Sequence, residues 1–154
     1  MKIFIIHGAY GNSKENWFPW LKEKLEEERH EIIVPDFPTP ENQSIDSWLY
    51  IFDKYLSEID NNIILIGHSL GPAFILSILE KIKTKVKASI FVSAFIGNIG
   101  IDDFDKINDT FVNKDFNFNK IKNNCSKFIL ISSDNDPYVP KNKIDELAEL
   151  LIVS

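Results

Sequence analysis

The chain has 154 residues, of which 44% are hydrophobic and 26% charged, and its formal net charge is −6 at pH 7. A chain of this length buries about 70% of the surface that its unfolded form exposes, so we predict one domain over residues 1–154. The hydrophobic content excludes a disordered chain, no apolar run approaches the roughly 20 residues of a membrane span, and lysines interleaved with acids disfavour a nucleic-acid surface. We therefore expect a soluble globular protein that binds neither nucleic acid nor a membrane.

The N-terminal sequence and the single cysteine bear on where the protein is located in the cell. Met1 leads directly into a short apolar run, and no long apolar region with a small-residue cleavage site follows, so nothing indicates an export signal. The single Cys125 cannot form an internal disulfide, which is typical of proteins in a reducing compartment. We expect a cytoplasmic protein.

The first third of the chain alternates between strand and helix patterns. Residues 2–6 form a continuous apolar run, and residues 17–28 place apolar side chains on one helical stripe. Pro19 fits the first turn of that helix, and Ser13 is a candidate N-cap. Residues 31–35 then read EIIVP, which predicts a second strand.

The middle third continues the alternation. A proline-rich loop covers 36–43, and the apolar residues from 45 to 59 recur with the spacing of an amphipathic helix. Residues 62–67 form an unbroken apolar strand, as expected for a strand buried on both faces. Residues 71–82 are apolar almost all round, which predicts a helix packed deep against a sheet.

The last third is less regular. Strands are predicted over 86–95 and 127–133, whereas residues 97–124 are the least regular segment and are rich in Asn, Asp and Lys. Residues 150–154, LLIVS, resemble the beginning of a further strand. Strands alternating with helices imply a mostly parallel sheet with helices on both faces, which is a three-layer α/β fold.

One serine lies at the junction of a buried strand and a helix. In the sequence GHSLG, Gly67 and Gly71 let the backbone turn sharply around Ser69 and His68. Such a G-x-S-x-G turn exposes a nucleophile at the carboxyl end of the sheet, where the N–H of Leu70 can bind a developing oxyanion. The alternative is an ordinary strand-to-helix turn, but the strand before and the apolar helix after it both match the catalytic context.

A second glycine loop follows the first strand. Residues 7–11 read HGAYG, so Gly8 permits a close turn beside His7, and the N–H of Ala9 can point at the same oxyanion. A tight turn without chemistry is the plain alternative. A dinucleotide-binding loop is a third possibility, but the glycine spacing does not match G-x-G-x-x-G.

A carboxylate follows the last predicted strand. Residues 132–140 read SSDNDPYVP, in which Asp134 and Asp136 both end up beyond a strand on the same edge as Ser69. The chain order serine, aspartate, histidine is the one that α/β hydrolases use, so either carboxylate could orient a histidine. The segment is also rich in turn-forming residues, which explains it without chemistry.

These motifs together resemble a known family. The sequences NWFPWLKEKLE, VPDFPTP, IDSWL, IGHSLG and SSDNDPYVP are similar to those of the small serine hydrolases of the retinoblastoma-binding protein nine type, in the α/β-hydrolase superfamily. The resemblance implies Ser69 as nucleophile, Asp136 as the orienting acid, a sheet without an inserted cap domain, and hydrolysis of small acyl esters without a cofactor.

The chain departs from that family in one respect. The resemblance places the catalytic histidine after a further strand, yet no histidine follows Asp136. Of the three histidines, we expect His68 to be packed, His7 to be structural and His30 to lie at the opposite edge of the sheet. We expect a C-terminally truncated chain that lacks the last strand and helix. A histidine from another copy and a loss of catalysis are the alternatives.

The remaining candidates for chemistry are weaker. Three dispersed histidines and one cysteine have no metal-binding spacing, so we predict no metal. No cationic partner for Cys125 is apparent, which indicates packing rather than a nucleophile. Four phenylalanines are candidates either for an acyl pocket or for ordinary core, and they are Phe104, Phe111, Phe116 and Phe118. A non-catalytic protein that holds a partner in the same pocket or on an exposed edge is the alternative function.

Overall fold

A five-stranded sheet forms the centre of the molecule, and all of its strands are parallel. The computed structural model describes residues 1–152, and the strand order is β2-β1-β3-β4-β5. The strands are β1 (Lys2–Ile6), β2 (Glu31–Ile33), β3 (Ile63–His68), β4 (Ala88–Val92) and β5 (Phe128–Ile131). The register pairs Ile5 of β1 with Ile66 of β3, and Ile66 with Ile90 of β4. All five strands therefore end at one edge of the sheet.

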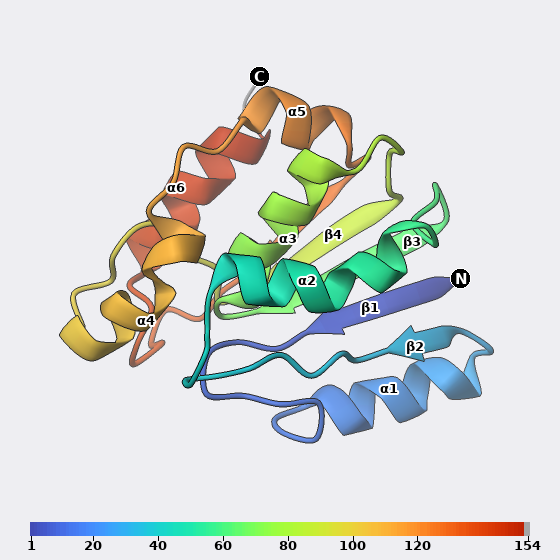
Figure 1. Cartoon of the computed structure of the whole chain (residues 1–154), viewed down its shortest axis with the longest axis horizontal. Coiled ribbons are helices and arrows are strands. Elements are labelled where there is room, and N and C mark those ends of the chain that lie inside the picture. The colour runs from blue at the N-terminus through green and yellow to red at the C-terminus, as the bar shows by residue number, and fades with distance from the viewer. Residues whose placement is uncertain (153–154) are drawn as a thin grey trace.

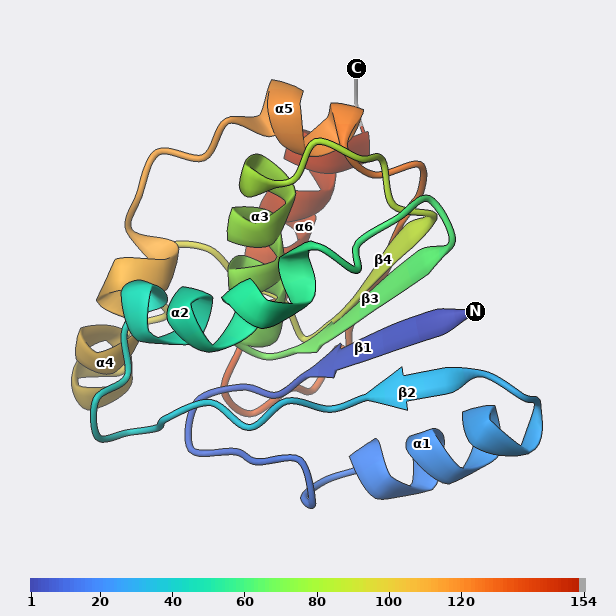
Figure 2. The same cartoon turned by 45° about the vertical axis from the view of Figure 1, so that its right-hand side comes forward.

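Helices cover both faces of the sheet, so the predicted three-layer arrangement is confirmed. The helices are α1 (Phe18–Glu27), α2 (Ile45–Leu56), α3 (Gly71–Lys81), α4 (Asp102–Val112), α5 (Phe118–Asn123) and α6 (Lys141–Ile152). Figure 1 and Figure 2 show α1 below the sheet and α2, α3 and α6 above it, with α4 beyond the carboxyl ends of the strands. Within residues 1–152, no helix is long and apolar enough to cross a membrane.

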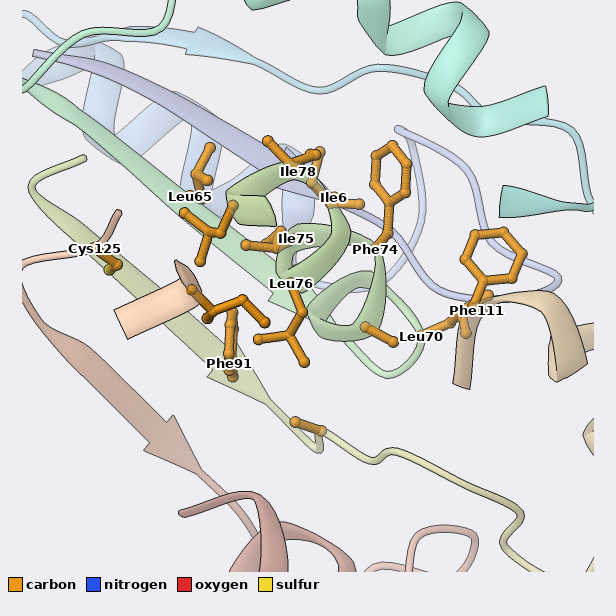
Figure 3. Packing of buried hydrophobic residues seen from close by; sticks show 14 of the residues in the cluster. Ile6, Leu65, Leu70, Phe74, Ile75, Leu76, Ile78, Phe91, Phe111 and Cys125 are labelled. Atoms are coloured by element: carbon orange, nitrogen blue, oxygen red, sulfur yellow. The ribbon is translucent and has the colours of Figure 1, made fainter. Parts of the chain in front are cut away.

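The main core lies between the sheet and α3. Alternate strand residues such as Phe4, Leu65 and Phe91 face this side and are fully buried. Figure 3 shows Ile75 and Leu76 of α3 beside Leu65 and Phe91 of the sheet, as the apolar character of that helix predicts. Parallel strands bury both of their faces, and this explains their continuous apolar sequences.

The other face of the sheet is covered only in part. Ile3 and Ile5 of β1 pack with Phe18 at the start of α1. Farther along the sheet, Ile129 and Ile131 of β5 point away from the main core and are 36% and 50% exposed. In the described part of the chain, α1 is the one helix on this side, and the apolar cluster that it forms with the sheet contains no residue of β5.

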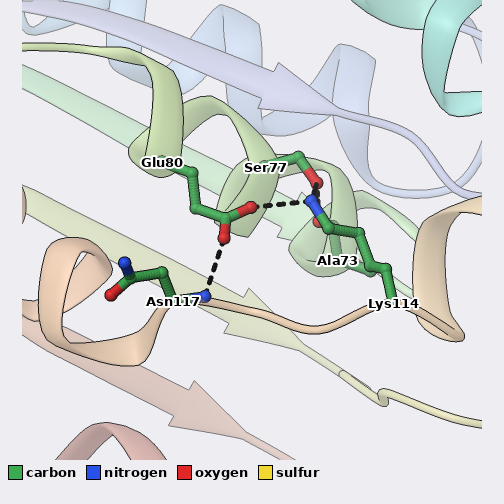
Figure 4. A network of polar contacts seen from close by, with 5 residues as sticks. All are labelled: Ala73, Ser77, Glu80, Lys114 and Asn117. Atoms are coloured by element: carbon green, nitrogen blue, oxygen red, sulfur yellow. Dashed lines mark hydrogen bonds and ion pairs between the residues drawn. The ribbon is translucent and has the colours of Figure 1, made fainter.

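Polar contacts fasten the connection between α4 and α5 to α3. The Lys114 ammonium donates to Glu80 at 2.7 Å and to the Ser77 hydroxyl at 3.2 Å. The backbone N–H of Asn117 donates to the other oxygen of Glu80 at 2.7 Å, as Figure 4 shows. These contacts fix the chain on its return from the carboxyl edge of the sheet.

Several predicted details need correction. The second strand ends at Ile33 rather than at residue 35, because the chain then turns away from β1 to run along the carboxyl edge. Ser13 does not cap α1, whose N-cap is Trp17. Instead the N–H and hydroxyl of Ser13 donate to the carboxylate of Asp36, which joins two loops. Pro19 does lie in the first turn of α1, as predicted.

The largest corrections concern the C-terminal half. Residues 97–124, predicted to be the least regular part of the chain, contain α4 and α5, and the apolar residues of α4 at 104, 107, 111 and 112 recur at helical spacing. Residues 150–152 are helical and continue α6, rather than beginning a strand, because Leu151 completes the buried stripe that Ile144 and Leu147 begin. The remaining residues of LLIVS, 153–154, lie outside the described residues.

Candidate active site

The turn at Ser69 is strained and tightly enclosed. Ser69 has a φ of +58°, a left-handed conformation that costs a non-glycine residue about 1 kcal/mol. Its N–H donates to the Val92 carbonyl at 2.9 Å, which ties the turn to the end of β4. A Cβ at Gly67 would lie 2.6 Å from the Pro72 nitrogen, and one at Gly71 would lie 2.4 Å from the Ile6 carbonyl oxygen. Only glycine fits at either position, so the sequence and the surroundings together enforce the turn.

The loop after β1 lies directly against this turn. A Cβ on Gly8 would be 2.8 Å from the Cβ of Ser69 and 3.3 Å from the backbone nitrogen of Leu70. The N–H groups of Ala9 and Leu70 donate to no acceptor among residues 1–152. Leu70 is also the N-cap of α3, where the helix dipole favours negative charge. The arrangement can therefore bind an oxyanion next to the Ser69 hydroxyl.

His7 supports the same loop and is not free to act as a base. It is fully buried, and the Phe37 N–H donates to its Nε2 at 2.9 Å. With Nε2 accepting, Nδ1 carries the proton and donates to the Gly8 carbonyl at 2.8 Å. Burial lowers the pKa of His7, an effect that the Gly8 hydrogen bond and the charges of Asp36 and Glu15 only partly offset. The imidazole is neutral, with both nitrogens engaged.

Asp136 lies in the loop after β5 and is half-buried. Its Oδ1 accepts the N–H groups of Tyr138 and Val139 at 2.9 and 3.0 Å. Partial burial opposes ionisation, but these two N–H groups, the Ser93 side chain and the nearby His68 outweigh it and lower the pKa of Asp136. Asp136 is thus an anion near neutral pH. Asp134, the alternative carboxylate, is exposed on the same loop.

Ser93 connects this carboxylate to the serine turn. It follows β4 directly, has a φ of +51°, and its side chain lies near enough to Asp136 to lower the pKa of that carboxyl. The preceding residue, Val92, accepts the hydrogen bond from the Ser69 N–H. The ends of β3, β4 and β5 therefore bring Ser69, Ser93 and Asp136 to one edge. Sequence reasoning missed Ser93, and the only local signal was a serine at the end of a predicted strand.

The other two histidines do not complete the site. His68 faces the α1 side, where its ring lies 5.9 Å from the rings of both Trp17 and Phe18. Burial lowers the pKa of His68, and the charge of Asp136 opposes that effect. His30 lies beside the amino terminus of Met1, at the other edge of the sheet. No imidazole in the described residues bridges Ser69 and Asp136 by a hydrogen bond, so the proton acceptor that a serine nucleophile needs is not assembled from residues 1–152.

A cavity of about 420 Å³ opens above the serine. Its lining consists of Ala9, Tyr10, Ser69, Ile101, Asp103, Phe104 and Tyr138. Four of these, Tyr10, Ile101, Asp103 and Tyr138, were not singled out from the sequence. They come from three separate loops or helix ends, and no local pattern marks residues that meet only after folding.

The phenylalanines divide between the two predicted roles. Phe104 lines the cavity, whereas Phe111 is fully buried against Trp48 in the core. Phe116 and Phe118 pack on each other with ring centroids 5.9 Å apart, away from the cavity lining. Cys125 is buried beside Ser89, and burial raises its thiol pKa, so its environment is that of a packed side chain.

Comparison with known proteins decides the family. The serine hydrolase family model matches residues 3–152. The chain belongs to the serine hydrolase family. This family member is 29% identical over 150 residues to YdeN of Bacillus subtilis (strain 168), covering 96% of this chain and 77% of YdeN. It is 28% identical over 153 residues to serine hydrolase RBBP9 of Rattus norvegicus, covering 97% of this chain and 80% of RBBP9. The resemblance found in the motifs is confirmed.

Solved structures agree with this assignment. The crystal structure of the ydeN gene product from B. subtilis superposes with a TM-score of 0.90 at 28% identity, covering 97% of this family member and 80% of that chain. Alpha/beta hydrolase domain-containing protein 10 from mouse matches with a TM-score of 0.72 at 15% identity, covering 98% of this chain and 76% of the mouse protein. The two proteins share the fold. The predicted α/β-hydrolase fold is therefore confirmed.

Proposed function

We propose that the protein hydrolyses small acyl esters through nucleophilic attack by Ser69. The observation that carries the proposal is the position of Ser69, which is held at a φ of +58° beneath a cavity and beside two N–H groups that donate to no acceptor within residues 1–152. A nucleophile placed next to preorganised donors is the arrangement that acyl transfer requires. Membership of the serine hydrolase family supports it.

The chemistry proceeds in two steps. The Ser69 hydroxyl oxygen attacks the acyl carbon while a base takes its proton, and the carbonyl oxygen becomes an oxyanion bound by the N–H groups of Leu70 and Ala9. The base returns the proton to the departing alcohol, which leaves an acyl-serine. Water then attacks that ester, its proton passes to the base, and the acid and free serine are released.

Residues 1–152 do not supply the base that accepts the Ser69 proton. Asp136 is ionised and lies on the same edge as Ser69, so it is suited to orient an imidazole through the N–H of the ring. We propose that this imidazole belongs to a histidine outside the 154 residues. In subtilisin, removal of the catalytic histidine lowers kcat on the order of 10⁶-fold. Without the imidazole we expect a comparable loss here, with residual catalysis from the oxyanion site and from substrate binding.

Covalent labelling with chemical rescue tests the proposal. We expect a fluorophosphonate to label the protein slowly at Ser69, and added imidazole to accelerate the labelling because it replaces the missing base. Intact-mass spectrometry with peptide mapping follows the modification, and Ser69→Ala provides the background. If the wild-type protein and Ser69→Ala react equally in the presence of imidazole, Ser69 is not the nucleophile.

A second variant tests whether His68 is the base instead. We expect His68→Phe to label at the wild-type rate with and without imidazole, because the His68 ring packs on the α1 side. A loss of labelling that imidazole restores in His68→Phe would assign the base to His68. Neither result bears on Ser69 as the nucleophile, which the comparison with Ser69→Ala tests separately.

A non-catalytic binding protein is the second candidate, because no imidazole among residues 1–152 bridges Ser69 and Asp136 by a hydrogen bond. In that case the cavity above Ser69 holds a ligand without turnover. Binding of a carboxylic acid product or an acyl ligand, detected by thermal shift, together with no acylation of Ser69 even in imidazole, would support this alternative.

A further inference from the structure

The cavity above Ser69 combines aromatic walls with a single charged side chain. Tyr10 and Tyr138 are 53% and 68% exposed, and Phe104 lies between Tyr10 and the buried Phe95, with ring centroids 6.5 and 5.7 Å away. Asp103 is the one ionisable carboxylate or ammonium side chain in the lining. Aromatic faces and a carboxylate both attract cations.

The charge of Asp103 is not neutralised by a neighbour. It makes no ion pair among the residues that the structure describes, and it belongs to the acidic first turn of α4 with Asp102 and Asp105. Lys106 lines a different cavity together with Asp102, and Lys143 pairs with Glu146 at 3.9 Å. An acyl group entering above Ser69 therefore meets net negative charge.

The wall that carries Asp103 is held in place. One oxygen of Asp105 accepts the Ile99 N–H at 2.8 Å, and the other accepts those of Gly100 and Ile101 at 2.8 and 3.1 Å. These three bonds fix the loop before α4, and hence the position of Ile101 and the first turn of the helix. The backbone that carries Asp103 thus has a defined place at the cavity.

We propose that this cavity selects esters with a positively charged group at the end of the acyl chain, over neutral esters and most strongly over anionic ones. The inference rests on the proposed function, since it assigns a substrate class to the same serine. Asp103 is the specificity-determining residue, and Tyr10, Phe104 and Tyr138 provide the aromatic surface for the cation.

Three p-nitrophenyl esters of equal chain length test the preference. They are the hexanoate, the 6-(trimethylammonio)hexanoate and the hemiadipate, which are neutral, cationic and anionic. Acylation of Ser69 is followed by intact-mass spectrometry in imidazole buffer at low salt, with the Ser69→Ala background subtracted. The ratio of cationic to neutral rates is compared among variants, so that differences in intrinsic reactivity between the esters cancel.

We expect Asp103→Asn to lower the cationic-to-neutral ratio about two- to fivefold, the scale of an exposed charge pair, and to raise the relative rate of the anionic ester. Asp102→Asn is the matched control, because it removes the adjacent charge that faces the other cavity, and it should keep the wild-type ratio. High salt should reduce the wild-type ratio toward that of Asp103→Asn.

The possible failures are distinguishable. If no ester acylates the wild-type protein above the Ser69→Ala background, the proposed function fails, and this inference fails with it. If all three esters acylate Ser69 but the ratio is the same in wild type and Asp103→Asn, the function stands and the charge preference is overturned. An equal loss of preference in Asp102→Asn would overturn the assignment to Asp103.

Discussion

At the scale of single residues, the contact between Gly8 and the serine turn sets the geometry of the oxyanion site. We expect Gly8→Ala to reduce the imidazole-assisted acylation of Ser69 at least about tenfold, because the added Cβ would lie 2.8 Å from the Ser69 Cβ and must displace one of the loops. Overpacking of this kind also costs about 1–3 kcal/mol in the free energy of unfolding, measured by urea denaturation. A folded Gly8→Ala variant with unchanged acylation would show that the loop does not contribute to the site.

His7 gives the protein a pH-dependent stability. Because burial lowers the pKa of His7 in the folded state, the unfolded chain takes up a proton near pH 6.5 that the folded protein does not bind. The unfolded state then holds more protons, so the free energy of unfolding decreases as the pH falls below about 6.5.

We expect His7→Gln to lower the free energy of unfolding by about 1–3 kcal/mol at pH 7.5, because the flexible amide does not reproduce the fixed positions of the two ring nitrogens or the packing of the ring on Phe37 and Trp48. Between pH 7.5 and pH 5.5, the variant should show a smaller decrease in this free energy than the wild type. Urea unfolding at both pH values measures the two effects. Burial also lowers the pKa of His68, so His68→Gln measured in parallel isolates the second contribution. If His7→Gln kept the full pH dependence, His7 would not be its source.

At the scale of elements, the loop before α4 depends on one carboxylate. We expect Asp105→Ala to accelerate hydrogen exchange at the amides of Ile99, Gly100 and Ile101, because all three donate to Asp105. The loss of these bonds should lower the free energy of unfolding by about 1–3 kcal/mol. Asp109→Ala is the control, since Asp109 accepts one side-chain bond from Asn113 and should leave those amides unchanged. Equal exchange in the two variants would contradict this role.

At the scale of the whole molecule, the sheet face beside α1 is an exposed apolar surface. A groove of about 410 Å³ lies there, and apolar side chains of α1, β1, β3, β4 and β5 dominate its lining. Parallel sheets bury both faces as a rule, so this surface departs from the rest of the fold.

We expect the native protein to bind the fluorescent dye ANS on this face, because exposed apolar patches bind such probes. Ile131→Lys should reduce the fluorescence, with a change in the free energy of unfolding of less than about 1 kcal/mol, since Ile131 is 50% exposed. Tyr50→Lys removes an 85% exposed side chain from α2, on the other side of the sheet, and should leave the fluorescence unchanged. Undiminished dye binding in Ile131→Lys would place the dye elsewhere.

The sequence by itself determined the features that depend on neighbours in the chain. The continuous apolar runs predicted each of the five strands within a few residues, and the glycines at 67 and 71 predicted the turn that exposes Ser69. Helix α4 was not predicted, although its apolar residues at 104, 107, 111 and 112 have helical spacing, because the Asn and Asp residues between them also favour loops.

Only the tertiary structure decided what surrounds that serine. The approach of Ser93 to Asp136, the hydrogen bond from the Phe37 N–H to His7, and the cavity formed by Tyr10, Phe104 and Tyr138 all join residues distant in the chain. Local patterns report the period of burial along one element, whereas these contacts arise where parallel strands end at a common edge and bring their following loops together.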